Sequence, residues 1–128
     1  MVRVWRVLAL SGALVVAGAW QYAPGTVTYE PPDAVMAQDT LGKTVFLGKG
    51  TCSACHGVEG KGSMLAPDLT DAAWLNIDGS VEAIVRLVKE GVAQPKEHPA
   101  PMPPMGGAQL TDAEVQAVAA YVKSLSAD

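Results

Sequence analysis

Cys52-Ser53-Ala54-Cys55-His56 is the stretch of sequence that decides the fold. It contains both cysteines of the 128-residue chain and places a histidine directly after the second one. The spacing Cys-x-x-Cys-His is an attachment signal for a c-type haem. Two thiols at this spacing can add to the two vinyl groups on one edge of a porphyrin, and the adjacent imidazole then falls under the ring and can bind the iron. The motif therefore predicts one covalent haem c, held by Cys52 and Cys55, with His56 on its iron.

Three other uses of a paired cysteine motif explain the sequence less well. A structural zinc site needs four Cys or His ligands, and His98 is the only further candidate, so the set stays one ligand short. A thioredoxin-like redox pair needs a strand before the motif, and no strand pattern precedes Cys52. A structural disulfide is possible in an exported protein, but it leaves His56 unexplained.

Composition agrees with a cofactor inside a small domain. The chain is 49% hydrophobic and 17% charged, yet it has one Phe, three Trp and three Tyr. A small domain with few large side chains has difficulty burying enough apolar surface to offset chain entropy, and a haem would fill such a core. Residues 25–128 carry 7 Lys and Arg against 13 Asp and Glu. This acidic balance argues against a nucleic-acid partner, which would need a basic patch.

Three segments have helical periodicity, and none alternates convincingly as a strand. The first is expected from about Thr40 to Lys49. The second runs from Ser80, a good N-cap, to Glu90, and Gly91 then stops it. The third is expected over residues 111–125 because Thr111 and Glu114 make a capping box ahead of apolar residues at helical spacing. The fold class is therefore predicted to be all-α.

The first 39 residues form two separate segments. Arg3 and Arg6 precede an uncharged stretch from Val7 to Ala23, which is the layout of an export signal or of a short membrane anchor. We favour an anchor over residues 1–23, with a cleaved signal as the alternative; either one exports the rest of the chain. Residues 24–39 contain Pro31-Pro32 and no helical period, so they are expected to form a linker before a domain at residues 40–128.

Residues 46–62 (FLGKGTCSACHGVEGKG), 64–69 (MLAPDL) and 101–125 (PMPPMGGAQLTDAEVQAVAAYVKSL) together resemble a class I monohaem cytochrome c. The resemblance covers residues 40–126. It implies a small cytochrome c fold with three main helices around a covalent haem, here preceded by an N-terminal hydrophobic helix. It also implies that the terminal helices cross, with Gly42 and Phe46 of the first packed against Val118 and Tyr121 of the last.

The same resemblance implies the iron ligands. In this family a methionine from a loop supplies the second axial ligand, and His/Met ligation raises the haem potential. Met102 fits the family loop better than Met105, so the expected ligands are His56 and Met102. His98, which would give a second imidazole, remains the alternative. The resemblance further implies that the Pro67 carbonyl accepts a hydrogen bond from the other ring nitrogen of His56.

The function expected from these features is one-electron transfer rather than enzymatic catalysis. The expected partners are redox proteins or a membrane complex of respiration or photosynthesis, and the chain could itself be a subunit of such a complex. No nucleic-acid partner and no small-molecule substrate are expected. The expected location is the periplasmic face of the cytoplasmic membrane, anchored by the N-terminal segment or released into the periplasm. Lys43, Lys49 and Lys61 near the motif could steer an acidic partner. The alternative is a five-coordinate haem that senses gases or reduces peroxide.

Overall fold

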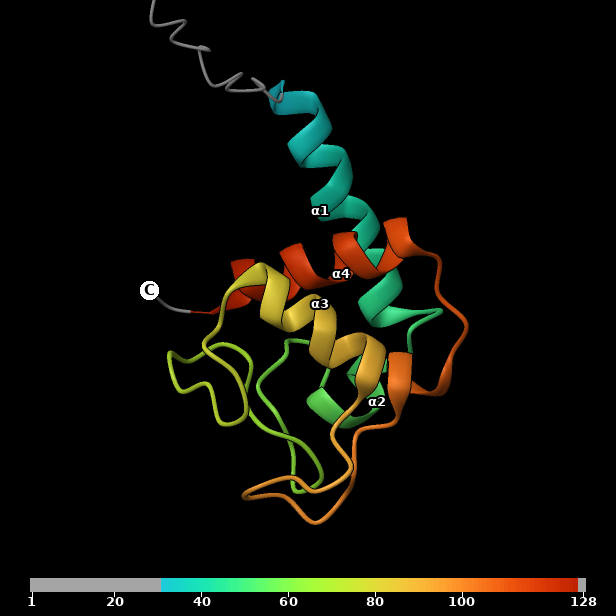
Figure 1. The fold of residues 1–128 in the computed structure, drawn as a ribbon. Coiled ribbons are helices and arrows are strands. Elements are labelled where there is room, and N and C mark those ends of the chain that lie inside the picture. Colours follow the sequence, from blue (N-terminus) through green and yellow to red (C-terminus); the bar gives the residue numbers. More distant parts are fainter. Residues whose placement is uncertain (1–30, 127–128) are drawn as a thin grey trace, which may run out of the picture.

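The computed structural model describes residues 31–126, in which four α-helices and one short 3-10 helix are joined by loops (Figure 1). Their bounds are α1 Pro32–Leu47, α2 Cys52–His56, α3 Val81–Glu90, η1 Pro104–Gly107 and α4 Asp112–Leu125. The only extended pairing among these residues is an isolated antiparallel bridge between Val92 and Met102. The prediction of an all-α fold with three main helices is therefore confirmed for the described residues.

The two later helices start where their capping residues predicted. Ser80 precedes α3, and its hydroxyl accepts a hydrogen bond from the Ala83 amide at 3.2 Å. Thr111 precedes α4, and both halves of its capping box with Glu114 are present. These side chains satisfy amides that the first helical turn leaves without a partner, which fixes where each helix begins.

The expected start of the first helix, near Thr40, is wrong: α1 begins at Pro32 and includes residues 32–39, which we had assigned to a linker. Proline is tolerated at the first helical position because the amide it lacks would have no intrahelical partner there. Residues 32–41 are almost all exposed, and this part of α1 stands clear of the other helices (Figure 1). The periodicity of buried residues could therefore not reveal the early start.

The predicted anchor or signal at residues 1–23, and the linker residues 24–30, lie outside the described residues. Among residues 31–126, no helix is both long and apolar enough to cross a membrane.

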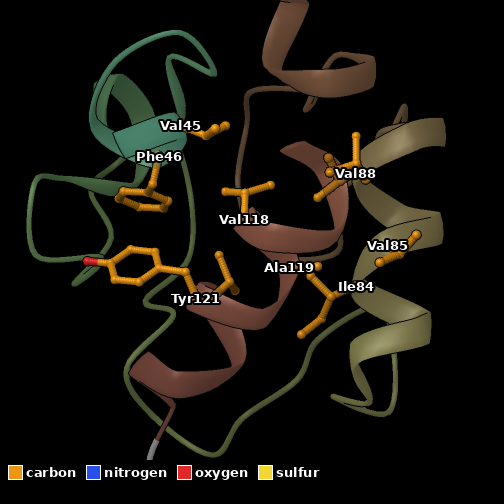
Figure 2. Close-up of a cluster of buried hydrophobic side chains, with 10 residues drawn as sticks. Val45, Phe46, Ile84, Val85, Val88, Val118, Ala119 and Tyr121 are labelled. Carbon is orange, nitrogen blue, oxygen red and sulfur yellow. The ribbon is translucent and has the colours of Figure 1, made fainter. Parts of the chain in front are cut away.

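The crossing of α1 and α4 forms the centre of the core, as the family resemblance implied. The Phe46 and Tyr121 rings pack edge to face, with centroids 5.6 Å apart and an interplanar angle of 62° (Figure 2). Gly42 allows this approach: a Cβ built there would overlap the Ala117 carbonyl oxygen and lie 2.6 Å from Tyr121 Cβ. α3 packs against α4 as well, and three of its buried side chains complete the cluster: Ile84, Val85 and Val88.

Gly42→Ala is expected to lower the free energy of unfolding by about 1–3 kcal/mol, the usual cost of forcing an extra methyl group into a packed site. The added methyl would separate α1 from α4 at their closest contact. Guanidinium unfolding followed by circular dichroism measures the change. Lys43→Ala, at the neighbouring exposed position, is the control and should stay within about 0.5 kcal/mol of wild type. Equal midpoints for Gly42→Ala and wild type would show that the helices do not meet at Gly42.

Candidate functional site

An apolar cavity lies between α2, α3, α4 and the two long loops, and it collects the residues that the sequence singled out. Cys52, Cys55 and His56 line it from α2, and Met102 lines it from the loop after α3. Met105 is not among its lining residues. Side chains of the core form much of the remaining wall: Phe46, Ile84, Val88, Val118 and Val122.

The attachment motif is held at both ends by hydrogen bonds to other segments. Thr51, just before α2, has left-handed backbone angles (φ 54°), and its hydroxyl donates to the Gly106 carbonyl at 2.9 Å. After α2, the Ser63 hydroxyl donates back to the Cys55 carbonyl at 2.7 Å. Gly57 follows at φ 78°, a conformation that an α-helix cannot continue. The motif is thus confined to a five-residue helix of fixed orientation.

His56 is buried, with 9% of its surface exposed, and one of its ring nitrogens makes a hydrogen bond. Its Nδ1–H donates to the Pro67 carbonyl at 3.0 Å, because a carbonyl can only accept. The predicted contact with Pro67 is therefore confirmed. Burial lowers the pKa of the imidazole below its usual value, so the neutral form is favoured. In that form the lone pair lies on Nε2, which is the state an imidazole needs to bind iron.

Both cysteines carry free thiols, and each is partly buried. Burial raises the pKa of the Cys52 thiol, which keeps it protonated. Two free thiols, one imidazole that burial keeps neutral and a surrounding apolar wall match what a covalently attached, water-excluding porphyrin requires. The residues present therefore fit the haem that the motif predicts.

Met102 is fixed through its backbone. Its amide donates to the Val92 carbonyl at 3.0 Å, and its own carbonyl accepts from the Val92 amide at 2.8 Å. Gly91 lies directly against the Met102 carbonyl, where a Cβ would overlap it. Met105, by contrast, has left-handed angles (φ 54°) inside the kinked η1 helix. This kink is consistent with the absence of Met105 from the cavity wall.

His98 lines the same cavity and is partly buried. His98 is the alternative iron ligand expected from the sequence, and its place on the cavity wall leaves that alternative open. Trp74 also lines the cavity, from the loop before α3.

The lysines near the motif are less available than their sequence positions suggest. Lys49 forms an ion pair with Glu114 at 2.8 Å, and Lys61 pairs with Glu59 at 3.1 Å. The Lys49 ammonium and the Thr111 amide both donate to the Glu114 carboxylate and lower its pKa to about 2. Lys43 makes no ion pair with a residue in the described range. The charge of this surface is therefore close to balanced.

Comparison with known proteins identifies relatives of this arrangement. Residues 40–126 match the protein-family profile described as cytochrome c. The chain is 41% identical over 101 residues to the cbb3-type cytochrome c oxidase subunit FixPc of Rhizobium leguminosarum bv. viciae, covering 77% of this chain and 31% of that protein. It is 36% identical over 97 residues to the cbb3-type oxidase subunit CcoP of Cereibacter sphaeroides, covering 73% and 29%. The chain thus spans about a third of the length of these curated relatives.

A solved structure supports the fold independently. The crystal structure of cytochrome cL from the marine methylotroph Methylophaga aminisulfidivorans superposes with a TM-score of 0.54 at 22% sequence identity. The match covers 70% of this chain and 55% of that one.

Gly62→Ala is expected to raise the reduction potential of the protein carrying its haem. A Cβ at Gly62 would lie 2.6 Å from the Asp68 amide nitrogen and 2.7 Å from the Pro67 carbonyl carbon, so the Pro67 backbone must shift, and we expect its hydrogen bond with His56 to be lost. Losing the bond at Nδ1 weakens the imidazole as a donor, which destabilises the oxidised iron. Spectroelectrochemical titration measures the potential.

Gly60→Ala is the matched control, since Gly60 has nearly the same φ (74° against 75°). Its Cβ would approach closely only the end of the flexible Leu125 side chain, and would lie at ordinary contact distance from Leu69 and Thr70. If the two variants have the same potential as wild type, the Pro67 contact does not tune the iron.

Proposed function

The chain belongs to the cytochrome c family, and from that premise we propose that it passes single electrons through a haem ligated by His56 and Met102, to or within a terminal oxidase complex. Family membership makes it an electron-transfer protein with a covalent haem c on Cys52 and Cys55. When bound, that haem supplies a one-electron Fe(III)/Fe(II) couple. The observation that carries the proposed ligation is that Met102 lines the same apolar cavity as His56 and both cysteines, whereas Met105 does not.

The residues around the cavity have distinct tasks in this proposal. The Pro67 carbonyl holds the His56 ring in one orientation, with Nε2 available. The bridge to Val92 holds the Met102 backbone, so the weak sulfur–iron bond need not also order a loop. The apolar wall excludes water, which reduces the reorganisation that accompanies each electron transfer. With His56 and Met102 both bound to the iron, no position would remain there for a substrate.

Met102→Ala is expected to abolish the weak sulfur-to-iron charge-transfer band of the oxidised protein and to lower its reduction potential. The physical reason is that a thioether ligand stabilises Fe(II) relative to Fe(III). Absorption spectroscopy and redox titration measure both effects. Met105→Ala is the matched control three residues away and should keep the band. Loss of the band in Met105→Ala alone would assign the ligand to Met105 instead.

The curated relatives support a respiratory setting. Both are subunits of cbb3-type oxidases, so we propose that this chain delivers electrons to an oxidase of that class or serves as one of its cytochrome subunits. The proposed location is the periplasmic face of the cytoplasmic membrane. Residues 1–23 would anchor the domain there, or would release it if they are cleaved. In the anchored form, residues 24–31 and the exposed half of α1 would separate the membrane from the cytochrome domain at residues 40–128.

Oxidation of the reduced protein by membranes containing a cbb3-type oxidase tests this pathway. We expect oxygen-dependent oxidation that cyanide blocks, measured by stopped-flow absorption. Because Lys49 and Lys61 are paired, the rate should fall only weakly as ionic strength rises. Membranes from a strain that lacks the oxidase are the control. Equal rates with both membranes would contradict the proposed partner.

A further inference from the structure

The chain has two histidines, and both line the same cavity. His98 lines it from the loop between α3 and η1, whereas His56 lines it from α2. The cavity therefore holds a second nitrogen donor that the ligation by His56 and Met102 does not use.

The His98 side chain has no polar partner among the described residues. Within residues 31–126 it makes no hydrogen bond and no ion pair, although it is partly buried. A partly buried imidazole without a polar partner carries a desolvation cost that a ligand would offset.

The loop that carries His98 is closed at its base. The two hydrogen bonds between Val92 and Met102 fix the ends of residues 93–101, and His98 lies within that closed segment. Met102 and His98 are four residues apart on this closed segment, and both line the cavity.

We propose that His98 is a reserve ligand for the haem iron, which takes the sixth position when the Met102 thioether is not on it. This inference rests on the ligation proposed above. In the exchange the Fe–S bond breaks and an Fe–N bond forms to the unprotonated ring nitrogen of His98; no electron is transferred. Imidazole is a good ligand for iron in proteins, so the exchange needs no further group. The iron stays six-coordinate, closed to small molecules, and its potential falls because the thioether is lost.

The test compares Met102→Ala, His98→Ala and the double variant, each with haem attached. In Met102→Ala the sulfur band should be lost while the absorption and electron paramagnetic resonance spectra stay low-spin, with the signature of two imidazoles. The double variant should be high-spin and should bind added imidazole at least tenfold more tightly than Met102→Ala does. His98→Ala alone should keep the wild-type spectrum. Far-UV circular dichroism and intact mass confirm that each variant is folded and carries haem.

The outcomes separate this inference from the ligation it rests on. A high-spin Met102→Ala, like the double variant, overturns the role of His98 and leaves Met102 as the ligand. A Met102→Ala protein that retains the sulfur band overturns the ligation itself. If Met102→Ala does not mature, heating provides the second measurement. Wild type should lose the sulfur band while staying low-spin, whereas His98→Ala should become high-spin; a high-spin transition in both overturns the proposal.

Discussion

The hydrogen bond from His56 Nδ1 to the Pro67 carbonyl determines what the rest of the structure can do. It leaves Nε2 as the nitrogen with a lone pair, and it sets the ring orientation in a site where burial already favours the neutral imidazole. The motif helix around His56 is held in turn by Thr51, which bonds to Gly106, and by Ser63, which bonds to Cys55. The ligand is therefore positioned by hydrogen bonds to two other segments, the loop of residues 63–67 and Gly106 of η1.

The core and the cofactor cavity are built from the same side chains. Ile84 and Val88 of α3 and Val118 and Val122 of α4 belong to the buried cluster, and all four also line the cavity. With one phenylalanine in the chain, the helices meet through small residues such as Gly42, and one side of the cluster faces the cavity rather than more protein. A bound porphyrin would complete this core and so would link the stability of the domain to the group that gives it its function.

Features that depend on residues close together in the sequence, such as helix caps and the attachment motif, could be predicted from the sequence. The caps at Ser80 and Thr111 set the starts of α3 and α4, and the five-residue motif placed the attachment site. The start of α1 differs from the prediction because two consecutive prolines, Pro31 and Pro32, are typical of a linker, whereas a proline such as Pro32 also suits the first turn of a helix. The place of His98 depends on how residues 93–101 fold back over the cavity, and the pairing of Lys49 with Glu114 joins residues 65 positions apart. Contacts of this range leave no periodic trace in a sequence.

The absorption spectrum of the wild-type protein with its haem attached, recorded oxidised and reduced with and without carbon monoxide, tests the central claim most directly. A cavity that supplies ligands on both sides of the iron predicts low-spin spectra in both oxidation states and no response to carbon monoxide. A high-spin spectrum that shifts when carbon monoxide is added would contradict the account, because it would show an open iron position and favour gas sensing or peroxide reduction over electron transfer.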